Sequence, residues 1–182
     1  DLTQYRDSIQ FMWDQTVRGI NKGLTLSEIT ELVQLPKKYE NRYFTQQFYG
    51  LVEHHVRQIH NGLIGWFDGD ESALFPLPVS KRVEKLIAGF GGIEKVREEI
   101  TKALEEDDLR WALELATWLI RIEINENGRS DGGETEDRNR LASILRKIGQ
   151  RTTSTNVRNW CLTRALELEG KLDLSRFRKH RF

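Results

Sequence analysis

Three of the four histidines in this chain lie within residues 49–78, and two of them are adjacent. Histidine titrates near neutral pH, so these side chains could bind a metal ion or transfer a proton. On a helix, ligands for one metal ion are spaced three or four residues apart. His55 and His60 follow His54 at offsets of one and six. The three imidazoles cannot converge on one ion, and we expect no metal site in this chain unless other chains supply ligands.

The helix that carries these histidines is predicted over residues 50–64. Its apolar residues recur at helical spacing and define a face expected to meet the core. They are Val52, Val56, Ile59 and Leu63. His55 flanks this face, and His60 is expected on a third side. His54 lies almost opposite Val52, so it should point toward solvent or another domain, where an imidazole can act as a general acid.

Other arrangements that could support catalysis do not occur. The chain has no Ser/His/Asp arrangement, no phosphate-binding glycine loop and no convergent pair of carboxylates. Its single cysteine, Cys161, lies in the apolar pattern "NWCLTRALEL" and is expected to be a buried structural thiol. We therefore do not expect this chain by itself to be an enzyme.

Composition predicts an all-α fold. The chain of 182 residues is 38% hydrophobic and 31% charged and contains three prolines, which is typical of a helix-rich globular protein. No apolar run approaches the roughly 20 residues that span a bilayer. The formal net charge is zero, which argues against nucleic acid as a partner, although the terminal "RFRKHRF" is basic. The start without methionine indicates the interior of a longer protein.

The helical pattern divides the chain into two parts, 1–78 and 79–182. The first predicted helix has apolar residues at helical spacing: Ile9, Met12, Trp13, Val17 and Ile20. Thr25 and Glu28 form a capping-box pattern at the start of the second. In the second part, helical hairpins over 93–122 and 136–169 resemble tetratricopeptide-like units, joined by a polar loop over 125–136.

Two other functions are compatible with this pattern. A stand-alone helical-repeat module would bind peptides in a groove between the two hairpins. A nucleic-acid binder would use "GLTLSEITELVQLP", which has helix-turn-helix character, but the next segment lacks the basic surface that reads bases.

Five segments, in order, resemble the dimerisation domain of the linear alkyl sulfatases. "YGLVEHHVRQIHNGLIGWFDGDESALFPLP" is similar to the family pattern Y-G-x-V-x-H-N-x-K-x-[IV]-Y-Q-x-Y-L-G-W-[FY]-D-G-N-P, followed by a loop that ends L-x-P. The other four are "MWDQTVRGINKGLTLSEITELVQLP", "YFTQQFYG", "GGIEKVREEITKALEEDDLRWALELATWLI" and "NVRNWCLTRALEL". Together they extend over most of the chain.

The resemblance implies an all-helical middle domain that forms an interlocked homodimer. It implies that this domain lies between an upstream metallo-β-lactamase-fold domain, which holds two zinc ions, and a downstream sterol-carrier-like domain. The whole enzyme would hydrolyse alkyl sulfate esters with zinc assistance. Residues 1–78 would then supply a dimerisation arm and a segment that faces the active site. The first helix, with Phe11 and Trp13, is the candidate arm.

The resemblance also assigns two candidate site residues. His54 matches the family histidine that helps to protonate the leaving alkoxide or to hold the sulfate. Trp66 matches a position that lines the alkyl sulfate pocket, or else packs in the core. Several positions around them differ from the family pattern and put the substrate in question. They are His55, His60, Asn61, Leu63, the "DGDE" sequence and Arg164.

Overall fold

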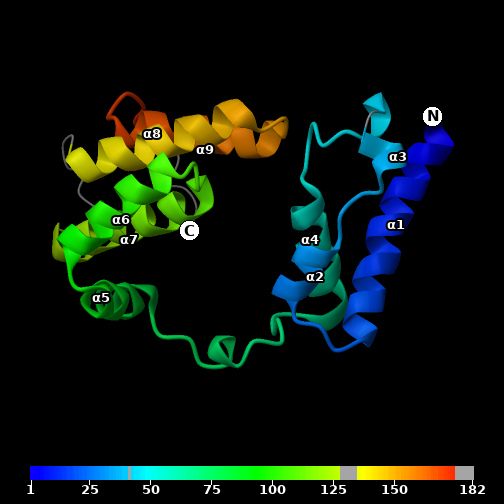
Figure 1. Cartoon of the computed structure of the whole chain (residues 1–182), viewed down its shortest axis with the longest axis horizontal. Helices are drawn as coiled ribbons and strands as arrows, with labels where there is room; N and C mark the ends of the chain where they lie inside the picture. The colour runs from blue at the N-terminus through cyan, green and yellow to red at the C-terminus, as the bar shows by residue number, and fades with distance from the viewer. Residues whose placement is uncertain (41, 128–134, 175–182) are drawn as a thin grey trace. The chain divides into compact units, whose positions relative to one another are not determined.

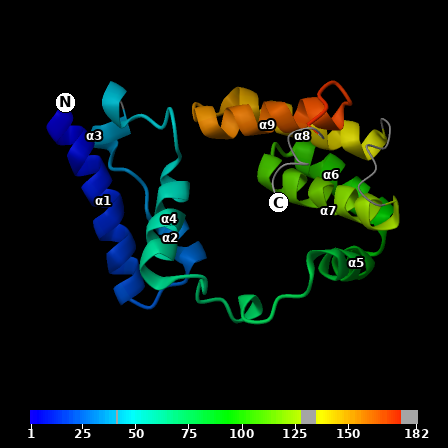
Figure 2. The same cartoon turned by 180° about the vertical axis from the view of Figure 1, so that it is seen from behind.

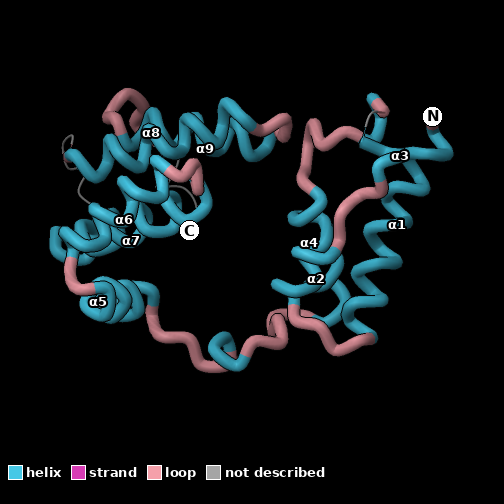
Figure 3. The backbone as a smooth tube through the Cα atoms, in the orientation of Figure 1, coloured by secondary structure: helices cyan, strands magenta, loops and turns pink. Residues whose placement is uncertain are grey.

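The computed structural model describes residues 1–40, 42–127 and 135–174, and within these ranges all regular structure is helical (Figure 3). Contacts divide the chain into two compact units. Unit 1 comprises residues 1–76 and 153–156, and unit 2 comprises residues 77–152 and 157–182. The predicted all-α fold is confirmed. The tetratricopeptide-like character of the second half stays a prediction.

Unit 1 contains four α-helices and two 3₁₀ turns. These are α1 (Leu2–Asn21), α2 (Leu26–Leu32), α3 (Lys37–Glu40), η1 (Tyr43–Thr45), α4 (Val52–Ile64) and η2 (Glu71–Ala73). Helix α4 packs against both α1 and α2 (Figures 1 and 2). The predicted capping box is present at the start of α2, where the Glu28 carboxylate accepts from the Thr25 N–H at 2.7 Å and the Thr25 hydroxyl accepts from the Glu28 N–H.

The buried face of α1 consists mostly of small residues. Met12 is buried, and its buried neighbours are Ser8, Thr16 and Gly19. Ile9 and Trp13 are 47% and 45% exposed. The hydroxyls tolerate burial because each donates to a carbonyl of its own helix, Ser8 to Tyr5 and Thr16 to Met12, both at 2.7 Å. Small side chains also allow a close approach, so this face packs against the core while the large apolar residues remain outside.

The buried face of α4 is also shifted from the predicted one. It runs through Val52, Val56 and His60, which are spaced four residues apart. His60 is only 3% exposed, so its expected position on a third side of the helix is wrong. Leu63, expected in the core, is 46% exposed. The core cluster of unit 1 reaches Ile59 and no further along α4, which leaves the last turn of the helix in solvent.

Unit 2 is built around α7. It contains α5 (Val79–Phe90), α6 (Ile93–Glu105), α7 (Leu109–Asn127), α8 (Glu136–Arg151) and α9 (Thr155–Leu168), whose first two residues are assigned to unit 1. Helix α7 packs against α5, α6 and α8. Phe90, Trp111 and Trp118 form an aromatic cluster with ring centroids 5.8–6.4 Å apart.

The predicted loop over 125–136 is shorter than expected, because α7 continues to Asn127 and α8 begins at Glu136. Residues 128–134 and the basic terminal segment lie outside the described ranges. Cys161 is buried, as predicted, and burial raises the pKa of its thiol, so little reactive thiolate forms at neutral pH.

Candidate functional site

His54 lies in the first turn of α4, on the exposed side of that helix. Half of its side chain is exposed, and its Nε2 lies 3.7 Å from the Glu53 carboxylate. The start of α4 is fixed by Gln47, whose side-chain oxygen accepts a hydrogen bond from the Val52 N–H at 2.8 Å. The imidazole is therefore presented to solvent from a well-anchored helix end.

The segment that leads into α4 is held at several points. Thr45 is buried, and its hydroxyl donates to the carbonyl of Tyr39. Within unit 1, the main chain of 153–156 also bonds this segment: the Thr155 N–H donates to the carbonyl of Phe48 at 2.7 Å. The Thr153 hydroxyl donates to the carbonyl of Gln47 at 3.2 Å. These bonds fix where α4 begins, and so where His54 lies.

His55 packs against the glycine that precedes α4. A Cβ atom at Gly50 would lie 2.7 Å from the Nε2 atom of His55, so no side chain fits there without a shift. His60 lies apart from both other histidines, buried in the core face, and its Nδ1 has no hydrogen-bond partner among the described residues. The three histidines thus occupy three different environments, and only His54 and His55 are exposed.

Trp66 follows the other end of α4. Its side chain is 75% exposed, which makes the core-packing interpretation wrong. The loop that carries it is fixed because the Leu26 N–H donates to the carbonyl of Asp68 at 2.9 Å, and the Trp66 ring lies 5.5 Å from that of Phe67. His54 and Ile64, the last residue of α4, are ten residues apart, about 15 Å along the helix, and Trp66 lies two residues further on. The two side chains therefore come from opposite ends of α4.

A second exposed feature is an apolar row on α1, which we call the α1 stripe. It consists of Leu2, Tyr5, Ile9 and Trp13, with exposed fractions between 45% and 81%. Spacings of three and four residues place all four on one side of the helix. Trp13 was predicted as part of the dimerisation arm, whereas Leu2 and Tyr5 were not. The spacing of three and four residues that links them to Ile9 and Trp13 is the signal that could have identified them.

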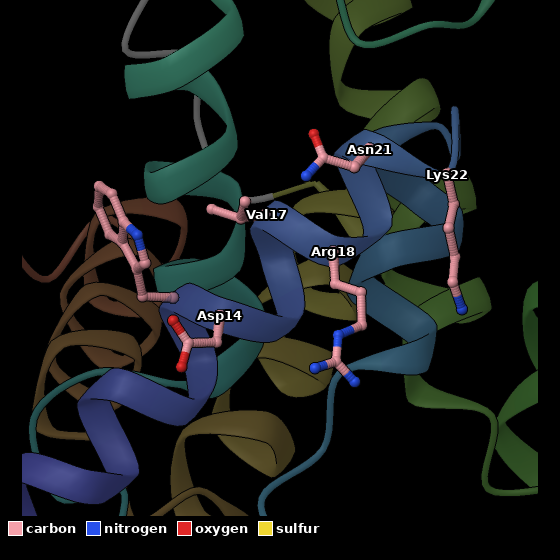
Figure 4. A pocket seen from close by; sticks show the side chains of 6 residues that line it. Asp14, Val17, Arg18, Asn21 and Lys22 are labelled. Carbon is pink, nitrogen blue, oxygen red and sulfur yellow. The ribbon is translucent and has the colours of Figure 1, made fainter.

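A shallow hollow of about 400 Å³ continues the α1 stripe toward the end of the helix (Figure 4). Its lining combines one indole and one valine with charged and amide groups: Trp13, Asp14, Val17, Arg18, Asn21 and Lys22. Five of these side chains come from α1, and Lys22 is the residue that follows it. The hollow is thus open and mixed in polarity, unlike a small-molecule pocket enclosed between elements.

Within residues 1–40, 42–127 and 135–174, no group of three or more His, Cys, Asp or Glu side chains is placed to hold a metal ion. None of the helices there is long and apolar enough to cross a membrane.

Comparison with known proteins gives the family. The sequence profile described as "Alkyl sulfatase dimerisation" matches residues 25–171. The chain belongs to the alkyl sulfatase dimerisation family. The segment that follows Thr25, the His54 helix and all the helices of unit 2 lie within the matched range, whereas α1 lies before it.

Relatives of this dimerisation domain are larger proteins. It is 39% identical over 173 residues to a linear primary-alkylsulfatase from Pseudomonas sp.. The match covers 94% of this chain and 31% of that protein. It is 28% identical to an alkyl/aryl-sulfatase from Saccharomyces cerevisiae, over 92% of this chain and 25% of that protein. The chain thus spans less than a third of these two relatives.

Solved structures agree with the sequence comparisons. The chain matches the stereoselective inverting sec-alkylsulfatase Pisa1 from Pseudomonas sp. with a TM-score of 0.80 and 25% sequence identity. The match covers 93% of this chain and 26% of that one. The helical arrangement described above is therefore that of a domain of alkylsulfatases.

Proposed function

We propose that this domain joins two copies of an alkyl sulfatase through the α1 stripe. The observation that carries the proposal is the stripe itself, four large apolar side chains aligned on one helix face and exposed. Contiguous exposed apolar patches mark association surfaces. The occupant is a second copy of this chain, because a domain that dimerises needs a surface that complements itself.

A two-fold axis suits the geometry of the stripe. Leu2 and Trp13 lie at its two ends, about 17 Å apart along the helix. An antiparallel pair of α1 helices would place Leu2 of one copy beside Trp13 of its partner, and it would cover Tyr5 and Ile9 between them. The hollow beside Trp13, with Asp14 and Arg18, would supply a polar rim around this apolar centre.

Trp13→Asp tests the interface by sedimentation velocity at micromolar concentration. Wild-type protein should sediment as a dimer and the variant as a monomer, because a buried charge without a partner opposes association. Trp160→Asp is the matched control, since Trp160 is 65% exposed on α9 and should leave the dimer intact. Dissociation by Trp160→Asp but not by Trp13→Asp would move the interface away from α1.

The second part of the proposal concerns the reaction. The whole protein hydrolyses alkyl sulfate esters, and His54 serves as the proton donor at the sulfate ester. Its exposed position in the first turn of α4 supports this role, because a proton donor must reach the substrate.

The chain carrying this domain also contains a metallo-β-lactamase-fold domain upstream and a sterol-carrier-like domain downstream. In this proposal the upstream domain holds the two zinc ions.

His54→Gln in the whole protein tests this role through the leaving group. Loss of a general acid lowers kcat by about 10²- to 10⁴-fold when the leaving group is a poor one such as a primary alkoxide. The loss should be much smaller for an aryl sulfate, whose phenolate leaves without a proton. His55→Gln is the control on the same turn. Equal losses for both substrates would exclude the proton-donor role.

Trp66 is proposed to contact the apolar part of the substrate rather than the sulfate. Its exposed indole and its distance from His54 along α4 support this division. Trp66→Ala should raise KM more for long alkyl sulfates than for short ones. An equal change at every chain length would remove Trp66 from the substrate site.

A further inference from the structure

We propose that Arg57 binds the negatively charged sulfate group of the ester on which His54 acts. The inference rests on the proposed function and adds the residue that would recognise the anion. Arg57 follows His54 by three residues in α4, and both side chains are exposed. Residues three apart on a helix have Cβ atoms about 5–6 Å from one another. One substrate group can therefore reach both side chains.

The guanidinium of Arg57 is available for a ligand. Its side chain makes no ion pair or hydrogen bond with any described residue of the chain. Most of the described arginines of unit 2 behave differently. Carboxylates within 2.5–2.7 Å occupy six of them: Arg97, Arg138, Arg140, Arg146, Arg151 and Arg164. Unlike these six, the guanidinium of Arg57 beside the proposed proton donor is unpaired among the described residues.

The carboxylate one turn before Arg57 in α4 does not pair with it. Glu53 precedes Arg57 by four residues, the spacing at which the two could pair. Its Oε1 atom instead lies 3.7 Å from the Nε2 atom of His54. Glu53 therefore lies beside the imidazole while the guanidinium stays open. Gln58 and Asn61, exposed on the same side of α4, add neutral hydrogen-bonding groups without adding negative charge.

The chemistry of the substrate suits a single guanidinium. An alkyl sulfate carries one negative charge, and hydrolysis adds one water to give an alcohol and hydrogensulfate. Arginine stays protonated throughout and presents planar N–H donors that match two oxygens of one anion. Arg57 therefore forms no covalent bond and transfers no proton. It binds the sulfate oxygens, and the proton at the ester oxygen is left to His54.

Steady-state kinetics of the whole protein test the assignment. Arg57→Gln should raise KM for an alkyl sulfate about 10- to 100-fold, which is the loss expected for one charge-assisted hydrogen-bonding group. The inhibition constant of inorganic sulfate should rise by a similar factor, while kcat changes less than about threefold. Arg57→Lys should recover part of the loss, since it keeps the charge but not the planar fork.

Two further variants distinguish a wrong assignment of Arg57 from a wrong proposed function. Arg121→Gln is the matched control, because Arg121 is exposed on α7 and its side chain has no partner among the described residues. Unchanged KM and sulfate inhibition in Arg57→Gln, with a lowered kcat in His54→Gln, would overturn the role of Arg57 alone. Full activity of His54→Gln would overturn the proposed function itself. Dissociation of the Arg57→Gln dimer would assign Arg57 to the interface and overturn the inference.

Discussion

The Ser154 hydroxyl donates a hydrogen bond of 2.8 Å to the main-chain carbonyl of Tyr49, across 105 residues of sequence. Ser154 is completely buried, and the Asn156 N–H makes a second, longer bond of 3.4 Å to the same carbonyl. Tyr49 lies just before α4, two residues ahead of Leu51. The hydrogen bond from Ser154 is one of the contacts that fix the helix carrying His54.

Ser154→Ala should destabilise the protein by about 1–2 kcal/mol. The substitution removes the hydroxyl donor and leaves the Tyr49 carbonyl with only the longer bond from Asn156. Urea denaturation at one fixed protein concentration measures the change. Ser72→Ala, at an exposed serine, should stay within about 0.5 kcal/mol of wild type. Equal stability of both variants would mean that the buried bond contributes nothing.

Gly19→Ala should be destabilising although alanine is the better helix former. A Cβ atom at Gly19 would lie 2.7 Å from Cγ1 of Ile29, a fully buried side chain, so one of the two must shift. Overpacking of this kind costs about 1–3 kcal/mol, more than the roughly 1 kcal/mol gained in helix propensity.

Gly62→Ala is the matched control for Gly19→Ala. Gly62 lies in α4, and a Cβ atom there would meet nothing within 4 Å. The substitution should therefore stabilise the protein by about 0.5–1 kcal/mol. Thermal denaturation of the two variants should shift Tm in opposite directions. If Gly19→Ala also raised Tm, the packing between α1 and α2 would be looser than the structure indicates.

The contribution of Glu169 to stability should depend on pH. Hydrogen bonds from Arg146, and next from Lys171, lower the pKa of Glu169 from 4.5 to about 2. Two bonds of 2.7 Å join its carboxylate to Arg146. Because the folded pKa is lowered, the stabilisation is complete above the unfolded pKa near 4.5 and is lost as pH falls toward 2.

Glu169→Gln should therefore cost about 1–2 kcal/mol at pH 7 and almost nothing near pH 2. Unfolding free energies of wild type and variant at several pH values give this difference directly. Glu98→Gln removes a carboxylate from an exposed pair with Lys95 and should cost less than about 0.5 kcal/mol at any pH. A pH-independent cost for Glu169→Gln would show that its charge is not what matters.

The helices could be predicted from the sequence because their signals are local. The spacing of apolar residues, the capping box at Thr25 and the glycines after α5 depend only on near neighbours in the chain. Gly91 ends α5 with φ of 100°, a conformation that glycine adopts without strain. The position of His54, opposite Val52 on α4, follows from the same helical period.

Which apolar face is buried could not be predicted in the same way. In α1 the period identifies one apolar row through Ile9 and Trp13, but burial follows the small residues that allow α2 and α4 to approach. The helical period of α4 likewise allows a buried face that includes His60 as readily as one that includes Leu63. In neither helix do its own residues decide which face is buried.

The sequence by itself determined the helical class, the order of the helices, the family resemblance and the outward direction of His54. Each of these depends on residues a few positions apart or on an ordered set of motifs. Tertiary structure alone decided that Trp66 is exposed, that His60 is buried and that Ser154 bonds to Tyr49. The physical reason is that burial and long-range hydrogen bonds depend on which surfaces meet after folding, and the spacing within one segment does not contain that information.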